Sequence, residues 1–489
     1  MRVLLVSTYD LGRQPLGLAS PAAWLRDAGV EVDCADTSRE RLTDERITSA
    51  GLVAFYLPMH TATRLASPLI ERVRRVNPEA PLAAYGLYAP LNQQWLREKG
   101  IAHVLGPEGE RELLDLAKGI ESPDAATHVS RSRGESPLHL HLSPDRGNLP
   151  PLASYAHLQM PDGSTRIVGN TDATRGCKHL CRHCPVVPVY RGRFHAIPVD
   201  IVFADIRQQV AAGAQHITFG DPDFLNGPTH ARRIVERLAA EFPGVTYDVT
   251  IKIEHILKHG SLLPVLAATG CLFITSAVES VDDEVLGHLA KGHTRADFVA
   301  AVHLCRDAGI PLAPTFVAFT PWTTLSGYGQ LLGMIEELEL VEQVAPIQLA
   351  IRLLITNGSP LLELPDIQRT VGNFDPASLT WPWRHPDVKV DALQQQVMRR
   401  VGNNPRASRL ETFGAIRDLF EETASGIEWH REDGVRADGT ESAAVTTLAS
   451  ARGCESRRHL TLSPQRAIPT LSENWYCCAE PSPEDMRLV

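Results

Sequence analysis

The sequence predicts an α/β protein made of a doubly wound N-terminal domain, a second α/β unit and a small, mostly helical C-terminal region with a cysteine-containing tail. Three observations lead to this prediction in the 489 residues. Apolar runs typical of buried strands alternate with amphipathic helical patterns over residues 1–120. The alternation repeats about six times between residues 164 and 362, and it is lost beyond residue 362.

The N-terminal elements follow one another at short intervals. Strands are expected at residues 3–7, 30–35, 52–57, 82–85 and 103–105, with helices at 21–28, 61–76 and 108–118. Buried strands separated by helices indicate a parallel sheet. Residues 121–163 are rich in Pro, Ser, His and Gly and show little periodicity, so we expect a linker that crosses the surface.

The second unit spans residues 164–362, and the C-terminal part follows it. Strands are expected at residues 166–168, 216–225, 247–255, 271–280, 312–319 and 347–355, and a helix at 200–212. In the region 363–450, residues 391–400 and 411–422 read as amphipathic helices and 432–442 as a polar loop. Residues 451–489 form the tail.

Composition narrows the class of protein. Hydrophobic residues at 43% and charged residues at 22% are ordinary for a globular chain. With 48 basic and 58 acidic residues the net charge is -10, and no basic block favours nucleic acid. No signal peptide or membrane-spanning run is evident, and nine cysteines form no regular disulfide framework. We therefore expect a cytoplasmic protein with a small-molecule substrate.

Three cysteines, Cys177, Cys181 and Cys184, stand at C-x3-C-x2-C spacing shortly after the strand predicted at 166–168. Three thiolates on one loop can hold three irons of a 4Fe-4S cluster and leave the fourth iron without a protein ligand. The alternative is a zinc site, which needs a fourth ligand such as His179 or His183.

This loop resembles the signature of the radical SAM enzymes. The resemblance implies a partial (β/α)6 barrel over the second unit, with S-adenosylmethionine (SAM) on the open iron and an external electron donor such as flavodoxin or ferredoxin. It also implies SAM contacts from strand ends, namely from Asp221, Asp223, Glu279 and Ser280. For each aspartate, a turn built by Asp and Pro is the plainer alternative.

Three further charged residues in the second unit have both a functional and a structural interpretation. Arg352 lies in an apolar run, where a buried guanidinium needs a partner. That partner is either a carboxylate of SAM or substrate or a glutamate of the barrel. Lys252 and Glu254, two positions apart on the expected strand 247–255, form either an ion pair with each other or a pair facing SAM or substrate.

The N-terminal domain resembles the cobalamin-binding domain that many radical SAM enzymes carry. Cobalamin domains of one type place a histidine in the first strand-to-helix loop, as D-x-H-x-x-G, but residues 7–17 contain none. Cobalamin can still bind without a protein ligand to cobalt. The missing histidine favours a domain that covers the site and does not require cobalamin.

The tail carries Cys477 and Cys478 side by side, and Cys454 lies upstream. Adjacent thiolates suit a soft trivalent centre such as arsenite, and Cys454 can complete such a site. A redox pair and two ordinary cysteines are the alternatives.

Over nearly its full length the chain resembles radical SAM proteins that have a cobalamin-type N-terminal domain and a Cys-Cys-Ala-Glu-Pro tail, as in arsinothricin biosynthesis. The resemblance implies transfer of the 3-amino-3-carboxypropyl group of SAM to arsenite, giving hydroxyarsinothricin and methylthioadenosine. Two other functions stay open, a cobalamin-dependent radical SAM methyltransferase and a non-catalytic thiol protein that binds arsenite. Spacing alone does not decide which carbon–sulfur bond of SAM breaks.

Overall fold

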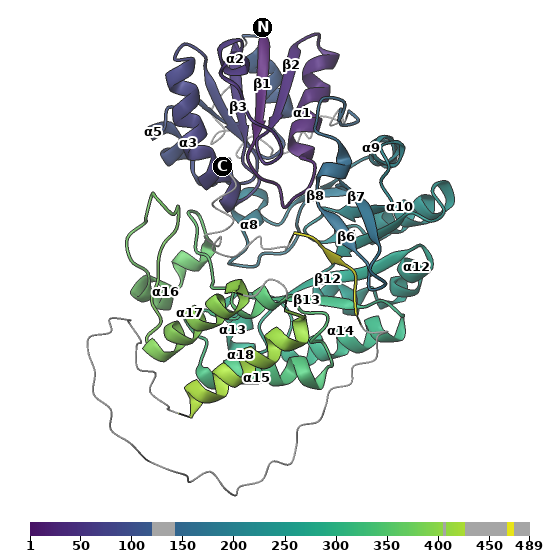
Figure 1. Ribbon diagram of the computed structural model, residues 1–489, viewed down its shortest axis with the longest axis vertical. Helices are drawn as coiled ribbons and strands as arrows, with labels where there is room; N and C mark the ends of the chain where they lie inside the picture. The colour runs from purple at the N-terminus through teal and green to yellow at the C-terminus, as the bar shows by residue number, and fades with distance from the viewer. Residues whose placement is uncertain (120–141, 404–406, 426–466, 474–489) are drawn as a thin grey trace, which may run out of the picture.

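A computed structural model describes residues 1–119, 142–403, 407–425 and 467–473 of the chain. Two sheets dominate it, and in Figure 1 the N-terminal sheet stands above the larger second sheet. The segment between residues 142 and 163 lies where the two units meet. This arrangement confirms the predicted fold class.

The N-terminal sheet has five parallel strands in the order β2-β1-β3-β4-β5. The strands are β1 (Arg2–Ser7), β2 (Glu31–Asp36), β3 (Leu52–Tyr56), β4 (Leu82–Tyr85) and β5 (His103–Val104). The helices are α1 (Leu16–Asp27), α2 (Asp44–Thr48), α3 (His60–Val76), α4 (Tyr88–Leu91), α5 (Gln93–Glu98) and α6 (Glu110–Ala117). Helices α1 and α6 pack on one face and the other helices on the opposite face, so the domain is doubly wound.

Helix α1 begins earlier than the sequence predicts. Pro21, expected at its start, lies inside it. Proline has no N–H to donate to the carbonyl four residues earlier, which here belongs to Gly17. The Tyr85 hydroxyl donates to that carbonyl oxygen at 2.7 Å instead. A side chain from β4 therefore supplies the hydrogen bond that the helix loses.

The expected surface linker is partly buried, which corrects the prediction for residues 142–163. Arg146 is buried and pairs with Asp205 of the second unit, with Nε and Oδ1 2.6 Å apart. The short strand β6 (His157–Gln159) pairs antiparallel with β7. Composition did not reveal these contacts because a proline-rich segment can still bury individual side chains.

The second sheet has seven strands in the order β13-β12-β11-β10-β7-β6-β14. Five of them are parallel: β7 (Thr165–Thr171), β10 (His216–Phe219), β11 (Thr246–Thr250), β12 (Cys271–Glu279) and β13 (Leu312–Phe316). The strand expected at 347–355 is wrong. Its first residues form the 3-10 helix Pro346–Leu349, and only the bridge between Phe319 and Arg352 continues the parallel order.

Helices cover the outside of this sheet, as in Figure 1. They are α9 (Val199–Ala211), α10 (Pro228–Glu241), α11 (Ile253–Lys258), α12 (Leu263–Ala268), α13 (Asp283–His288), α14 (Arg295–Asp307) and α15 (Leu325–Glu337). The short helix α8 (Val186–Tyr190) instead lies between the two units, beside α4. A two-stranded ribbon, β8 (Thr174–Gly176) and β9 (Phe194–Ala196), flanks the predicted cluster loop. The 3-10 segments are Leu152–Ser154, Phe224–Asn226, Gly260–Leu262 and Pro360–Glu363.

The C-terminal region is helical, as predicted. It contains α16 (Pro365–Thr370), α17 (Val388–Asn403) and α18 (Arg409–Ala424). α17 and α18 pack against the main core of the second unit, whereas α16 packs into a separate, smaller apolar cluster. The strand β14 (Thr470–Leu471), yellow in Figure 1, adds antiparallel to β6 at the edge of the second sheet. The expected loop 432–442 lies outside the described residues.

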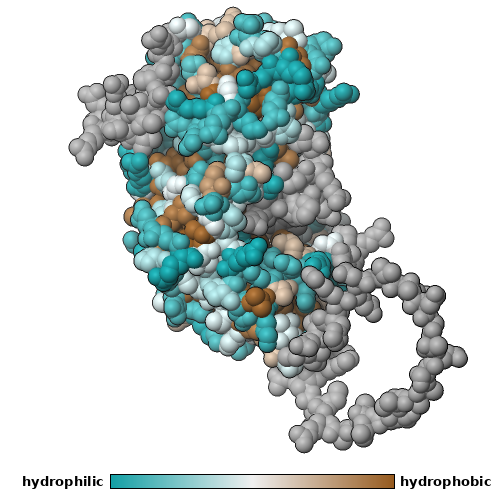
Figure 2. Space-filling model, turned by 90° about the vertical axis from the view of Figure 1, so that its left-hand side faces the viewer, coloured by the Kyte–Doolittle hydropathy of each residue, from teal (hydrophilic) through white to brown (hydrophobic). Residues whose placement is uncertain are grey.

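The surface mixes polar and apolar residues. On the face shown in Figure 2, hydrophilic and hydrophobic residues are interspersed over both units. Large hydrophobic side chains are exposed at four described positions, Met1, Leu180, Leu304 and Val388. None of the described helices combines the length and hydrophobicity needed to cross a membrane.

Candidate active site

The three loop cysteines line one cavity. Cys177, Cys181 and Cys184 lie between β8 and α8, and none of the three is in a disulfide. The cavity, of about 250 Å³, is bounded by the ends of the barrel strands and by the N-terminal domain. Burial raises the pKa of the Cys177 thiol to about 11. Such a thiol is not a free nucleophile at neutral pH, whereas iron would hold it as the thiolate. The donor set and its confinement to one cavity fit a 4Fe-4S cluster.

The zinc alternative needs a fourth ligand, for which His179 and His183 are the candidates. Each has its Nε2 3.0 Å from a carboxylate oxygen, of Asp223 or of Glu279, so each histidine ties the loop to the barrel. A histidine in such a contact can still bind a metal through Nδ1. The Nδ1 of His179 lies 3.2 Å from the Lys252 ammonium, whereas the Nδ1 of His183 has no hydrogen-bond partner among the described residues, so zinc stays an alternative through His183.

His179 is held from both of its nitrogens. Its Nε2 meets Asp223, and the Lys252 ammonium, which can only donate, lies 3.2 Å from its Nδ1. His255 also approaches Asp223, with Nδ1 2.6 Å from Oδ2. Burial raises the pKa of Asp223, but hydrogen bonds from the two imidazoles outweigh it and lower the pKa. The positive charge of Lys252 opposes a metal ion bound between His179, Asp223 and His255. We therefore interpret these side chains as a hydrogen-bonded network.

His183 is fixed by Glu279, the last residue of β12. Oε1 of Glu279 lies 3.0 Å from Nε2 of His183 and 3.4 Å from Nζ of Lys291. Burial raises the pKa of Glu279, but the positive charges of Lys291 and His183 bring it down to about 2. Glu279 also adopts φ 69°, a left-handed conformation that is costly for a residue with a side chain. Such strain at a cavity wall is typical of functional positions.

Asp221 organises the start of the cluster loop. Its carboxylate accepts from the backbone N–H groups of Ala173 and Thr174 and from the Thr174 hydroxyl. Burial and the neighbouring Asp172 raise its pKa to about 7. Both Asp221 and Asp223 line the cavity, as the sequence predicts for SAM contacts, but their oxygens are engaged by protein groups.

The remaining predicted positions differ from one another. Ser280 accepts from the N–H of Asp282 in the turn after β12 and does not line the cavity. Arg352 pairs with Asp391 of α17 at 2.7 Å and stacks over the Trp383 ring. This is the internal ion pair left open above, with Asp391 in place of a barrel glutamate, so the structure does not support Arg352 as a SAM contact.

Lys252 and Glu254 do not lie on a strand. β11 ends at Thr250 and α11 begins at Ile253, which corrects the predicted strand 247–255. The two side chains pair at 3.3 Å, so the structural interpretation of an ion pair is confirmed. Lys252 is nevertheless buried and lines the cavity.

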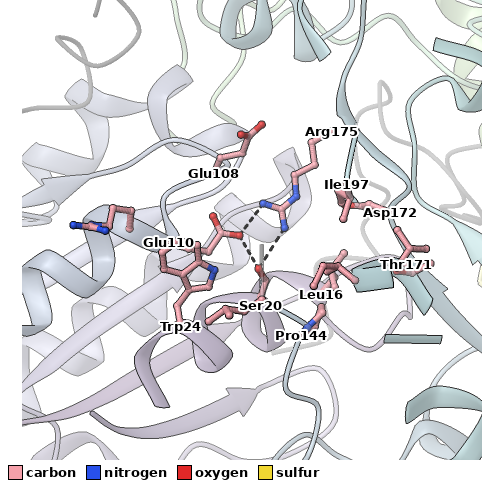
Figure 3. A pocket seen from close by; sticks show the side chains of 14 residues that line it. Leu16, Ser20, Trp24, Glu108, Glu110, Pro144, Thr171, Asp172, Arg175 and Ile197 are labelled. Carbon is pink, nitrogen blue, oxygen red and sulfur yellow. Dashed lines mark hydrogen bonds and ion pairs between the residues drawn. The ribbon is translucent and has the colours of Figure 1, made fainter. Parts of the chain in front are cut away.

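A buried ion pair joins the cluster strand to the N-terminal domain. Figure 3 shows Arg175 of β8 pointing toward Glu110 of α6 and Ser20 of α1. The Arg175 Nη1 lies 2.7 Å from Glu110 Oε1, and the Ser20 hydroxyl donates to the same oxygen at 2.7 Å. Arg175 precedes Cys177 by two residues, so this contact positions the loop. No local sequence pattern predicts this ion pair, because the partners are 65 residues apart.

The N-terminal domain supplies part of the cavity wall through residues that the sequence did not single out for function, including Leu11, Arg13 and Met59. No histidine of this domain lines that cavity or the neighbouring cavity between the units. The described residues therefore offer no imidazole for cobalt, and we derive no step through cobalamin. Cys454, Cys477 and Cys478 lie outside the described residues.

Comparison with known proteins agrees with this geometry. Residues 172–323 match the model of the radical SAM superfamily. The tRNA-2-methylthio-N(6)-dimethylallyladenosine synthase of Flavobacterium johnsoniae is 25% identical over 293 residues, 54% of this chain and 56% of the relative. The ribosomal protein uS12 methylthiotransferase RimO of Syntrophotalea carbinolica is 22% identical over 244 residues, 48% of this chain and 50% of the relative. The chain thus spans about half the length of the curated relatives it matches.

Solved structures extend the likeness to both units. The cobalamin-dependent radical enzyme OxsB, with aqua-cobalamin bound, has a TM-score of 0.62 at 13% identity over 86% of this chain and 71% of the other. TsrM from Kitasatospora setae, a methyltransferase with cobalamin and a 4Fe-4S cluster bound, has a TM-score of 0.59 at 16% identity over 87% of this chain and 99% of the other. At these identities the likeness shows the fold. The chain contains a radical SAM domain with the architecture of these cobalamin-dependent enzymes.

Proposed function

We propose that this chain is a radical SAM enzyme that transfers the 3-amino-3-carboxypropyl group of SAM to arsenite. The observation that carries the enzymatic part is that three cysteines outside any disulfide, Cys177, Cys181 and Cys184, line one cavity at the barrel mouth. The adjacent thiols Cys477 and Cys478, with Cys454, support arsenite as the acceptor because trivalent arsenic is a soft, thiophilic centre.

The chain's own residues hold and shield the reactants. The three cysteines would hold the 4Fe-4S cluster, which when bound and reduced supplies the electron that breaks a carbon–sulfur bond of SAM. Lys252 and Lys291 place two buried ammonium groups on the cavity wall, where they favour the SAM carboxylate. Glu279 is held ionised beside them and can accept from ribose hydroxyls. The N-terminal domain excludes water from the cavity.

The electron balance requires a partner. One electron breaks the bond between sulfur and the amino-acid side chain, which releases methylthioadenosine. A second electron and the loss of one hydroxide from arsenite complete the new carbon–arsenic bond. We assign both electrons to a low-potential donor of the flavodoxin or ferredoxin class. Leu180, 59% exposed in the cluster loop and close to Gly192, gives this donor an apolar contact beside the exposed Arg191 and Arg193.

The test is an anaerobic reaction of cluster-reconstituted protein with SAM, reductant and arsenite, analysed by mass spectrometry. Methylthioadenosine together with an organoarsenical carrying the four-carbon amino acid is expected. Cys477→Ser should abolish the organoarsenical, while Ser482→Ala in the same tail should not. Deoxyadenosine without an organoarsenical would contradict the proposal.

A second candidate is a cobalamin-dependent methyltransferase, favoured by the likeness to OxsB and TsrM. A corrinoid that copurifies with the protein, and methyl transfer in place of arsenic chemistry, would support it. A non-catalytic arsenite-binding protein is the third candidate. It predicts that Cys177→Ala leaves both arsenite affinity and biological function intact.

A further inference from the structure

The C-terminal segment before the tail cysteines is built into the second sheet. β14 pairs antiparallel with β6, with Thr470 opposite Gln159 and Leu471 opposite Leu158. Ser472 extends this pairing, since its N–H donates to the His157 carbonyl at 2.8 Å and its hydroxyl accepts from the His157 N–H at 3.0 Å. Residues 470–472 therefore run along the sheet edge toward the N-terminal domain.

Glu473, the next residue, reaches the N-terminal domain. Its Oε2 accepts from the Tyr9 hydroxyl at 3.1 Å, and its Oε1 lies 3.2 Å from Nη2 of Arg39. Its carboxylate also lies against Gly12, where a Cβ would stand only 2.5 Å from the Glu473 Cδ. Gly12 adopts φ +65°, a conformation that favours glycine, and a side chain there would displace the Glu473 carboxylate. We call Tyr9, Gly12 and Arg39 the Glu473 receptor.

The receptor is held in place by surrounding contacts. The Arg39 guanidinium lies over the Tyr155 ring, and the Tyr155 hydroxyl donates to Asp36 at 2.8 Å. The carbonyl of Gly12 accepts from the N–H of Ala156 at 2.8 Å. The receptor therefore joins the first loop of the N-terminal domain, the loop after β2 and the segment that leads into the second unit.

The same first loop forms a wall of the cavity. Asp10, Leu11 and Arg13, which are next to Tyr9 and Gly12 in the sequence, line the cavity together with the cluster cysteines. Cys477 follows Glu473 by four residues. A chain of four residues spans at most about 14 Å. Glu473 thus joins the C-terminal segment to the loop that forms a wall of the cavity, four residues before Cys477.

We propose that the Glu473 receptor is a positioning site that presents the C-terminal cysteines to the cavity. The loop that offers a cobalt ligand in D-x-H-x-x-G proteins would serve here to anchor the chain's own substrate-binding segment. The contacts between Glu473 and the receptor are part of the structure, whereas their role in presenting arsenite depends on the function proposed above.

A distance measurement tests the anchor without any turnover. In a Cys454→Ser, Cys478→Ser background, a nitroxide is attached to Cys477 of the cluster-loaded full chain. The cluster would occupy three of the other thiols. Burial raises the pKa of Cys34 and Cys305 to about 12 and that of Cys271 well above its usual value, so these three react slowly. The reduced, paramagnetic cluster should then strongly accelerate the spin relaxation of the label, compared with the oxidised cluster.

The variants decide the outcome. Glu473→Ala and Arg39→Met should lose most of the relaxation enhancement, Arg39→Lys should retain it, and Arg41→Met, an exposed neighbour, should behave like the parent. The cluster signal of each sample shows that it is folded and loaded. An enhancement that Glu473→Ala leaves unchanged, or that the parent lacks, would overturn the proposal.

Turnover separates this proposal from the function on which it builds. In the otherwise wild-type chain, Glu473→Ala should keep the rate of SAM cleavage but lower the organoarsenical formed per SAM cleaved by about tenfold or more, since misplacement of a reactant costs rate steeply. Relaxation that depends on Glu473 without any organoarsenical, even in the wild type, would leave the anchor standing and refute the arsenic chemistry.

Discussion

Glu110→Gln tests whether the N-terminal domain positions the cluster strand. Glu110 pairs with Arg175 at 2.7 Å, and the two side chains are only 11% and 17% exposed. Removing one partner of a buried ion pair leaves the other charge uncompensated, at a cost of about 3–5 kcal/mol for complete burial. Because this pair retains some solvent, we expect the free energy of unfolding to fall by about 2–3 kcal/mol.

The control is the same substitution at a surface pair. Glu241 lies 2.5 Å from Arg207, but the side chains are 27% and 47% exposed, and surface pairs contribute about 0–1 kcal/mol. Glu241→Gln should therefore have a small effect. Urea unfolding of both variants and of the wild type gives the free energies of unfolding to be compared. The iron content per chain shows whether the cysteine loop still binds a cluster, since Arg175 precedes Cys177 by two residues.

The pH dependence gives a second check on the same variant. Burial raises the pKa of Glu110, but Arg175 and Ser20 outweigh it and lower the pKa below the model-peptide value. Stabilisation by the ionised carboxylate is therefore present at neutral pH and lost as the pH falls through the lowered pKa. The difference between wild type and Glu110→Gln should shrink in acid. A Glu110→Gln effect at neutral pH that is no larger than that of Glu241→Gln would refute the reasoning.

Three other predictions concern single residues. Because the pKa of Asp221 is raised to about 7, its carboxyl group holds a proton to higher pH in the folded state than in the unfolded state. The free energy of unfolding should therefore fall by up to about 4 kcal/mol between pH 4 and 7. Asp221→Asn should remove this slope in thermal unfolding. Arg352→Met should cost about 1–2 kcal/mol in urea unfolding but leave SAM affinity unchanged in calorimetry, and weaker SAM binding at unchanged stability would contradict the ion-pair role. Leu180→Asp should slow cluster reduction by flavodoxin about tenfold and not reduction by dithionite, whereas Leu304→Asp, 37% exposed on α14, should change neither.

The sequence predicted parallel strands best where short apolar runs stood between turn residues. All five predicted N-terminal strands are present, and they alternate with helices along the chain. The failure at residues 347–355 has a physical reason. That run is apolar because it is buried on all sides, and periodicity alone cannot distinguish a buried strand from other buried backbone. Pro346, which starts the 3-10 helix, was the available signal against a strand.

The cysteines and carboxylates of the candidate site could be predicted from the sequence, but the side chains with which they pair could not. Cysteine spacing located the cluster loop, and strand ends located Asp221, Asp223 and Glu279 on the cavity wall. The pairing of His179 with Asp223 and of His183 with Glu279 joins residues 44 and 96 positions apart. Such pairs depend on the curvature of the sheet, which local patterns do not encode.

The two loop histidines and Arg175 together explain why the cluster loop needs both units. His179 and His183 tie the loop to two different barrel strand ends, and Arg175 ties its first strand to α6. Three side chains thus fix the loop at three points, which restricts the thiols before any cluster binds. A loop fixed in this way loses less conformational entropy on taking up iron. The N-terminal domain therefore contributes to the site through Glu110 and the Glu473 receptor, whether or not it holds a cofactor of its own.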